Sequence, residues 1–139
     1  MNMFKITGAI HVTLFRASRG KVGGAFRGAQ VLLLTTKGRR SGKLRTTPLL
    51  YLRQDGGRLA IVASKGGAPN HPAWFLNLRD DPAVTVELAG SGRAPYRARV
   101  AEGEEREALW AQLVAMYGSY AAYQEKTSRE IPVVVLEPA

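Results

Sequence analysis

Six short apolar runs, bounded by turns or short helical segments, limit most strongly what this chain can fold into. Runs of this length that are rich in Val, Ile, Leu and Thr are typical of β-strands, and glycine-containing turns between several of them indicate hairpins. The expected strands are residues 31–34, 44–52, 59–64, 84–88, 96–100 and 131–136. Such a series favours a small, mostly antiparallel barrel over a doubly wound parallel sheet.

About three helices are expected before and between these strands, which makes the fold class α+β. Residues 4–15 place their apolar side chains loosely along one side and are interpreted as a helix. Asn70 is the candidate N-cap of a second helix that has Pro72 in its first turn. Acidic residues from Glu104 onward favour the start of a third helix, which ends near Gly118.

Length and composition predict one domain, residues 1–139, with residues 1–22 as an N-terminal helix or arm. The chain has no cysteine, which excludes disulfides, thiolate metal sites and a cysteine nucleophile. The apolar pieces near the N-terminus are interrupted by Lys5, His11 and Arg16, so neither a secretory leader nor a membrane span is expected there. The expected location is the cytoplasm.

The positive charge is concentrated in the first part of the chain. The net charge is +9, and residues 1–54 contain 11 of the 20 Lys and Arg but none of the 11 Asp and Glu, so this part carries +11 and the rest −2. Such asymmetry predicts an anionic partner, which is nucleic acid, a lipid surface or a small ligand with phosphate or carboxylate groups. Charge alone does not choose among these three.

Histidine-based catalysis has little support in the sequence. His11 and His71 are the two histidines, and neither belongs to a nucleophile or metal-binding motif. Both are interpreted as ordinary polar residues, and no metal site is predicted.

The turn at residues 37–45 is the first candidate binding element. Glycines at both ends let the backbone curl and present its amide N–H groups to an anion. Arg39, Arg40 and Arg45 offer guanidinium groups to phosphate oxygens, and Ser41 adds a hydroxyl donor. The spacing is neither that of a P-loop nor that of a dinucleotide fingerprint. A solvated, highly charged hairpin tip explains the same residues equally well.

A second cluster follows the third expected strand. Ser64 and Lys65 precede two glycines that allow a ligand close to the backbone, and an antiparallel sheet would let both cationic turns border one cleft. Trp74 begins the next helix with Asn77 three residues later on a neighbouring position, so a flat ring would have a wall. Core packing is the alternative interpretation of the aromatic side chains at 74 and 75.

Three tyrosines recur at every third position in the segment before the last strand. In a helix, Tyr117, Tyr120 and Tyr123 would share roughly one side and could line a pocket. Ordinary core packing is again the alternative, although each buried hydroxyl needs a partner or water.

Several motifs in order resemble one family. They are LTTKGRRSGKLRTTPL at 34–49, ASKGG at 63–67, PAWFLNL at 72–78 and IPVV at 131–134, within a similarity that runs from about residue 23 to 138. The chain resembles the deazaflavin-dependent nitroreductases of actinobacteria. The resemblance implies a split β-barrel like that of FMN-binding proteins, and binding of coenzyme F420, whose reduced form gives a hydride to an acceptor.

The resemblance also implies roles for residues at matching positions. The phosphate and polyglutamate tail would be held by Arg39, Arg40, Ser41 and Arg45. The coenzyme would run along Thr46, Thr47, Pro48, Leu49, Leu50, Val62, Ala63, Ser64 and Lys65. Its other side would be closed by Ala73, Trp74, Phe75, Leu76 and Asn77. Tyr120 would stand at the mouth of the pocket and contact both coenzyme and acceptor, with Tyr117 and Tyr123 as further acceptor contacts.

The expected activity is therefore hydride transfer from the reduced coenzyme to an electron-poor small molecule such as a quinone, a nitroaromatic or a conjugated enone. The proton would come from solvent or from the hydroxyl of Ser64 or Tyr120. Leu50 stands where family members can have tyrosine, so acceptor preference does not transfer. A peripheral membrane contact through the N-terminal arm and the oligomeric state stay open. The alternatives are a basic nucleic-acid-binding module and a split barrel that binds FMN or haem.

Overall fold

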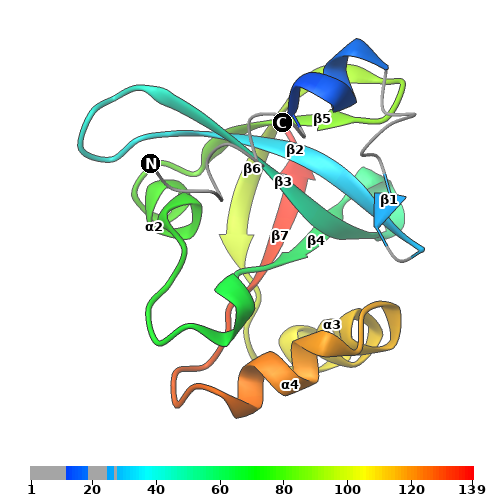
Figure 1. Cartoon of the computed structure of the whole chain (residues 1–139), viewed down its shortest axis with the longest axis vertical. Coiled ribbons are helices and arrows are strands. Elements are labelled where there is room, and N and C mark those ends of the chain that lie inside the picture. Colours follow the sequence, from blue (N-terminus) through cyan, green and yellow to red (C-terminus); the bar gives the residue numbers. More distant parts are fainter. Residues whose placement is uncertain (1–11, 19–24, 27) are drawn as a thin grey trace.

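Six antiparallel strands close into a barrel in the computed structural model, which describes residues 12–18, 25–26 and 28–139 (Figure 1). The strand order β1-β2-β3-β4-β7-β6-β5 is closed by a further pairing between β2 and β5, which leaves the two-residue β1 outside the ring. The strands are β1 (Ala25–Phe26), β2 (Ala29–Lys37), β3 (Leu44–Arg53), β4 (Leu59–Val62), β5 (Ala83–Leu88), β6 (Gly92–Val100) and β7 (Val133–Pro138). This confirms the expected barrel of about six antiparallel strands.

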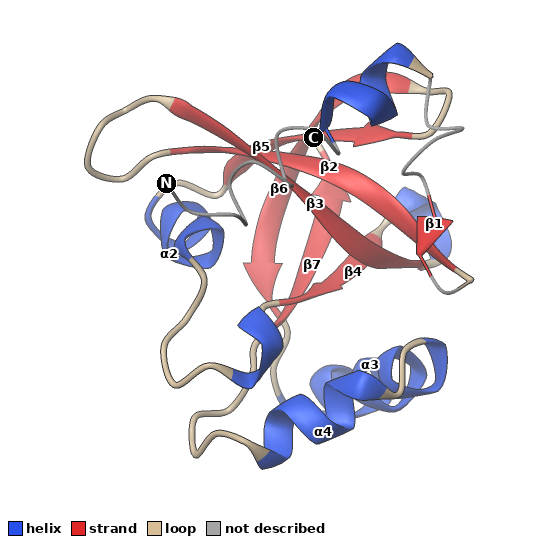
Figure 2. Ribbon diagram, in the orientation of Figure 1, coloured by secondary structure: helices blue, strands red, loops and turns tan. Residues whose placement is uncertain are grey.

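The helices lie at the barrel's edges (Figure 2). They are α2 (Ala73–Asp80), α3 (Gly103–Met116) and α4 (Ser119–Glu125), with single 3₁₀ turns η1 (Asp55–Gly57) and η2 (Lys65–Gly67). Residues 12–17 are also helical. The helix expected at 4–15 and the arm expected at 1–22 lie mostly outside the described residues.

Five expected boundaries were wrong. The strand expected at 96–100 begins at Gly92, because residues 92–95 also pair with β5. Pro72, not Asn70, is the N-cap of α2, because Pro72 keeps an extended backbone and its carbonyl accepts the first helical hydrogen bond. The first strand is longer than 31–34 because its residues through Lys37 pair with β3. The strand expected at 59–64 ends at Val62, since Ser64 turns into a helical conformation. The last strand covers Val133–Pro138 instead of 131–136.

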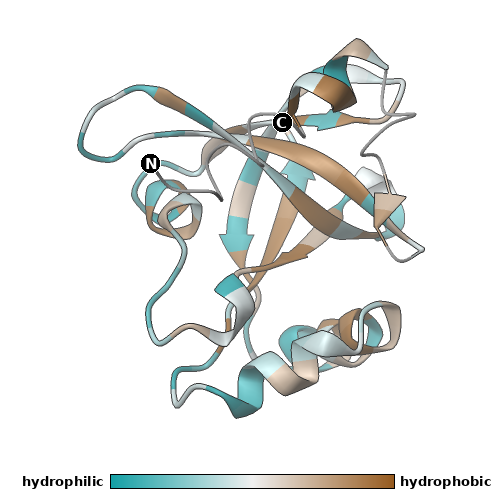
Figure 3. Cartoon of the chain, in the orientation of Figure 1, coloured by the Kyte–Doolittle hydropathy of each residue, from teal (hydrophilic) through white to brown (hydrophobic). Residues whose placement is uncertain are grey.

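The barrel is filled by alternate residues of its strands, which appear as the apolar colour on the ribbons in Figure 3. Leu59 and Ile61 of β4 face this interior, while Ala60 and Val62 face a second apolar cluster under α3 and α4. The neighbouring β7 alternates between the same two clusters. Burial on both faces explains why these strands read as continuous apolar runs in the sequence.

The barrel opens between β3 and β4. Along its length β3 pairs with β2 from Leu44 to Tyr51, but it pairs with β4 only at Leu52 and Arg53. The rest of β3 continues past the barrel as a projecting hairpin with β2 (Figure 1). One edge of β3 therefore lacks a strand partner over residues 44–51, and a proline at position 48 is tolerated there.

Candidate functional site

A cavity of about 430 Å³ lies where β3 and β4 separate. Its volume falls within the range of about 300–1,000 Å³ that is usual for small-molecule sites. The walls come from β1, β3, the end of β4, the start of α2 and the α3–α4 region. The lining residues are Phe26, Thr47, Pro48, Leu49, Leu50, Val62, Ser64, Lys65, Gly66, Pro72, Trp74, Tyr117, Tyr120 and Tyr123.

The cavity brings together residues of four of the sequence motifs that were singled out, but none from the turn at 37–45 or from the motif at 131–134. Eleven of the expected site residues line it, and they come from the β3 motif, the β4 end, the α2 start and the tyrosine segment. The remaining ten do not line it: Arg39, Arg40, Ser41, Arg45, Thr46, Ala63, Ala73, Phe75, Leu76 and Asn77. The cationic turn thus stands beside the cavity along β3, while Lys65 is the cation of its wall.

The two aromatic side chains at the start of α2, Trp74 and Phe75, differ in their surroundings. Trp74 is 8% exposed, packs in the barrel core and also lines the cavity, whereas Phe75 is confined to the core. Their rings meet edge to face with centroids 6.4 Å apart. Trp74 is therefore both a core residue and part of the cavity wall, whereas Phe75 is a core residue.

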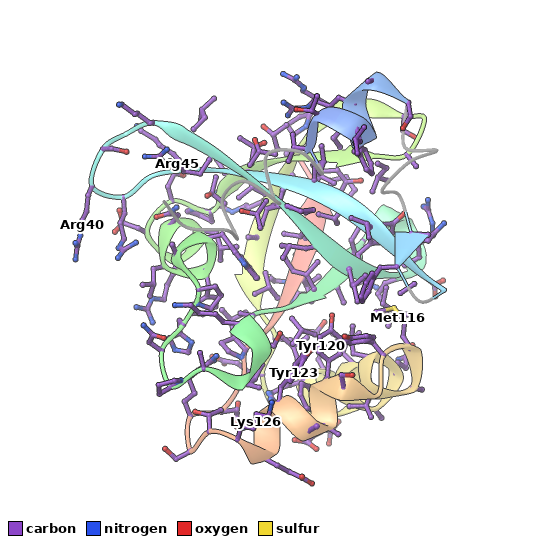
Figure 4. All side chains as sticks on the ribbon, viewed as in Figure 1. Arg40, Arg45, Met116, Tyr120, Tyr123 and Lys126 are labelled. Carbon is purple, nitrogen blue, oxygen red and sulfur yellow. The ribbon has the colours of Figure 1, made fainter. Side chains whose placement is uncertain are left out.

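The three tyrosines form one cluster in the cavity wall, and Figure 4 labels two of them, Tyr120 and Tyr123, on α4. The ring centroids of Tyr117 and Tyr120 lie 5.0 Å apart, each lies 6.3 Å from that of Tyr123, and the hydroxyls of Tyr117 and Tyr123 are 3.3 Å apart. They do not share one helix as expected, because Tyr117 ends α3 in an extended conformation and the other two lie on α4. The helical path is interrupted at Tyr117, and the three rings nevertheless lie together.

Three hydroxyls of the cavity are available to a ligand. The side-chain oxygens of Thr47, Ser64 and Tyr120 form no hydrogen bond with any other described residue. Burial, with smaller contributions from Tyr117 and Tyr123, raises the pKa of Tyr120 well above its ordinary value. Tyr120 therefore keeps its proton at neutral pH and offers it in a hydrogen bond.

The cationic turn is held by its own backbone. The N–H groups of Gly38 and Gly42 donate to carbonyls within the turn, and that of Lys43 donates to the Ser41 hydroxyl oxygen at 3.1 Å. The N–H of Arg39 donates to Asn77 at 3.1 Å. These four amides are thus not offered to an anion as the sequence predicted, and binding falls to the side chains. The exposed cations are Lys37, Arg39, Arg40, Lys43 and Arg45.

Asn77 connects this turn to the barrel. Its side-chain oxygen accepts from both the backbone and the guanidinium of Arg39, and its amide donates to the Thr36 hydroxyl at 3.2 Å. The residue is 4% exposed. It positions the turn relative to Trp74 on the same helix, so its role in the structure is to hold the turn.

Phe26, Gly66 and Pro72 also line the cavity and were missed. Phe26 is 48% exposed and lies 6.2 Å from the Tyr117 ring. A two-residue strand gives no periodic signal, so its position could not be read from the sequence. Gly66 and Pro72 each adjoin a residue or motif that had been identified.

A smaller cavity of about 290 Å³ lies between residues 15–16 and the β5–β6 hairpin. Its one carboxylate, Glu87, is paired with Arg16 at 3.1 Å and with Arg93 at 3.3 Å. Its charge is therefore neutralised within the protein.

Comparison with known proteins gives a consistent result. A family model described as F420H(2)-dependent quinone reductase matches residues 8–138. An F420H(2)-dependent quinone reductase of Mycobacterium tuberculosis is 39% identical over 132 residues, which cover 91% of this chain and 87% of that protein. The structure of an F420-H2 dependent reductase, FDR-A, has a TM-score of 0.70 and 45% identity, covering 77% of this chain and 93% of that one. A structure described as a domain-swapped dimer has a TM-score of 0.73 and 39% identity, covering 93% of this chain and 96% of that one.

In the described residues, no helix is long and apolar enough to cross a membrane.

Proposed function

This chain belongs to the F420H(2)-dependent quinone reductase family, and from this premise we propose that it reduces a quinone with the deazaflavin coenzyme bound in the cavity between β3 and β4. The observation that carries the proposal is the convergence of residues from four separate motifs on that one cavity. When bound, the reduced coenzyme supplies a hydride, which together with a proton converts a quinone to a hydroquinone.

The residues of the cavity fit a flat, polar ring system. Trp74 offers an aromatic face, and the β3 residues Thr47 to Leu50 lie on a strand whose edge lacks a partner. Ser64 offers a hydroxyl, and Lys65 a positive charge. Aromatic and apolar walls with a few placed polar groups are typical of cofactor sites.

The anionic tail of the coenzyme would be bound outside the cavity by the cationic turn. Arg40 and Arg45 are exposed on this turn, and Figure 4 shows them on the hairpin that projects from the barrel. Because no Asp or Glu occurs before residue 55, no carboxylate of that part of the chain neutralises them. Guanidinium groups bind phosphate and carboxylate oxygens through paired hydrogen bonds.

The tyrosine cluster would form the acceptor side. The hydroxyls of Tyr117 and Tyr123 form a hydrogen bond with each other. Tyr120 would present its protonated hydroxyl to a carbonyl oxygen of the acceptor. Because Tyr120 holds its proton strongly, we propose that it acts as a hydrogen-bond donor and that solvent supplies the proton. Nitroaromatic compounds and conjugated enones are further candidate acceptors of the same electronic character.

Titration with oxidised coenzyme F420 tests the proposal. The wild-type protein is expected to change the fluorescence of the coenzyme on binding and, with the reduced coenzyme, to consume a simple naphthoquinone. The variant Arg40→Ala/Arg45→Ala should bind the coenzyme about tenfold more weakly, because two charge-assisted contacts are lost while the Arg39–Asn77 contact is kept.

The matched control is Arg93→Ala/Arg97→Ala, which removes the same charge from exposed residues of β6 that do not line the cavity. It should bind the coenzyme like the wild type. Absence of any optical change with the wild-type protein would refute the proposed function.

The two alternative functions are tested by parallel binding assays with the same protein. A nucleic-acid-binding module would retain DNA or RNA at physiological salt, with an affinity that falls steeply as salt rises. A flavin or haem protein would show the corresponding absorbance shift with FMN or haem and none with the deazaflavin. The peripheral membrane contact depends on residues 1–22, most of which lie outside the described residues, and it stays a prediction.

A further inference from the structure

Arg129 binds the backbone of the loop that follows β4. Its guanidinium donates to three backbone carbonyls: Ala63 at 3.2 Å, Ser64 at 2.8 Å and Ala68 at 2.9 Å. It also donates to Nδ1 of His71 at 3.1 Å. The connection is long-range, since Arg129 precedes β7 and the loop lies more than fifty residues earlier in the chain.

The guanidinium has no carboxylate partner among the described residues. The neighbouring Glu130 pairs instead with Arg106, 3.0 Å away. An arginine whose charge is met only by carbonyl oxygens and a neutral imidazole polarises those groups. Its positive charge is thus directed into the loop.

The loop backbone has the alternation that makes a concave row of N–H groups. Ser64 has φ −80° and ψ −38°, a right-handed helical conformation, and Lys65 has φ 45°, which is left-handed. Successive residues of this kind form a nest that binds an anionic oxygen. The N–H groups of Ser64, Lys65 and Gly66 donate to no other described residue.

Arg129 fixes the direction of two of these donors. The C=O and N–H of a trans peptide unit point in opposite directions, and none of the described bonds is cis. Because Arg129 binds the oxygens of Ala63 and Ser64, the N–H groups of Ser64 and Lys65 point away from it. The same three residues, 64–66, line the cavity.

We propose that Arg129 is a positioning residue that holds Ser64, Lys65 and Gly66 as a wall of backbone N–H donors for a carbonyl or anionic oxygen of the bound ligand. The inference rests on the proposed function, and it names a role for a residue that does not touch the cavity. The oxygen belongs either to the coenzyme ring or to the acceptor, which gains negative charge as it takes up the hydride. Polarisation of the two peptide units by the guanidinium strengthens their N–H groups as donors.

The test compares Arg129→Gln with Arg106→Gln. Arg106 is a matched control because its guanidinium also donates to a carbonyl, that of Ile131 at 2.8 Å, and it does not contact the loop. Both variants should lower the thermal midpoint.

We expect Arg129→Gln to lose about tenfold in affinity for oxidised coenzyme F420, or to raise the acceptor KM about tenfold with coenzyme affinity kept. The first result places the oxygen on the coenzyme and the second on the acceptor. Arg106→Gln should change neither by more than about twofold.

A second measurement uses the wild-type protein, so it does not depend on the folding of a variant. In ¹⁵N-labelled protein, saturation with the coenzyme, or with coenzyme and a naphthoquinone, should shift the amide signals of Lys65 and Gly66. Unshifted signals in both complexes overturn the inference, as does equal behaviour of the two variants in binding and kinetics. A wild-type protein that does not bind the coenzyme instead overturns the proposed function, and this inference with it.

Discussion

The side-chain oxygen of Asn77 accepts two hydrogen bonds from Arg39, one from its backbone N–H at 3.1 Å and one from its guanidinium at 3.3 Å. Asn77→Ala should therefore lower the free energy of unfolding by about 2 kcal/mol, because a buried side chain loses three hydrogen bonds and the buried Thr36 hydroxyl loses its donor. It should also weaken coenzyme binding, since the cationic turn is no longer held. Denaturant titration and coenzyme titration measure the two effects.

Thr36→Val is the control for this prediction. It removes the hydroxyl that accepts from the Asn77 amide at 3.2 Å but keeps the shape of the side chain and both bonds to Arg39. It should lower the free energy of unfolding by about 1 kcal/mol and leave the affinity for the coenzyme unchanged. A Thr36→Val variant that binds as weakly as Asn77→Ala would show that Asn77 acts through strand packing instead.

Gly67 is packed tightly against α4. It has φ +84°, and an added Cβ would lie 2.6 Å from the backbone oxygen of Tyr123. Gly67→Ala should lower the free energy of unfolding by more than about 2 kcal/mol and separate the loop from the tyrosine wall. Gly90→Ala, at φ +74° with no atom within 4 Å, isolates the cost of the backbone conformation and should lose only about 1 kcal/mol. Equal losses of unfolding free energy in the two variants would show that the contact between residue 67 and the Tyr123 backbone is not what destabilises Gly67→Ala.

The buried Tyr120 makes the protein sensitive to alkaline pH. Burial raises the pKa of Tyr120 in the folded state above its value in the unfolded chain, so its contribution is fully present below about pH 10 and is lost at higher pH. The free energy of unfolding should fall above about pH 10. Tyr120→Phe should reduce this slope, and phenolate absorbance should show the delayed ionisation. The same slope in both proteins would contradict the assignment.

His71 gives the opposite dependence at acidic pH. Burial, followed by the charges of Arg129 and Arg79, lowers the pKa of His71, and its Nδ1 must be unprotonated to accept from Arg129. As pH falls below about 6.5 the unfolded chain takes up the proton first, so stability decreases. His71→Gln should flatten the stability curve between about pH 7 and 5. Denaturant titrations over this interval decide the matter.

Phe26 is expected to affect the acceptor and not the coenzyme. Its exposed ring lines the cavity beside Tyr117. Phe26→Ala should raise the KM of an apolar quinone by about threefold or more, with coenzyme affinity unchanged. Val100→Ala removes another exposed apolar side chain, from β6, and should leave both constants as they are. Weaker coenzyme binding by Phe26→Ala would place the ring on the coenzyme side.

Local patterns predicted the strands well where the pairings follow the chain, as they do for β2–β3, β3–β4 and β5–β6. The hairpin at 37–44 and the one at 88–92 join strands adjacent in sequence, so turn residues and alternation were enough. The closure between β2 and β5 joins strands about fifty residues apart, and only the expectation of a barrel pointed to it.

The site was predicted where motifs line it and missed where distant residues support it. The tyrosines do meet, although the continuous helix assumed for them is broken at Tyr117. Arg129 lies in a short polar connector, and its partners are 58 to 66 residues away in sequence. No periodicity marks such a residue, because its role depends on the tertiary fold.

The divergence of β3 from β4 has a consequence for how such enzymes diversify. The two walls of the cavity share few hydrogen bonds with each other, since β3 and β4 are paired at only two positions. Residues of α4 and β1 can therefore be exchanged during evolution without disturbing the pairings that close the barrel. On the proposed function, selection for a new acceptor can act on the wall formed by α4 and β1 while the β3 wall, which would hold the coenzyme, is inherited unchanged.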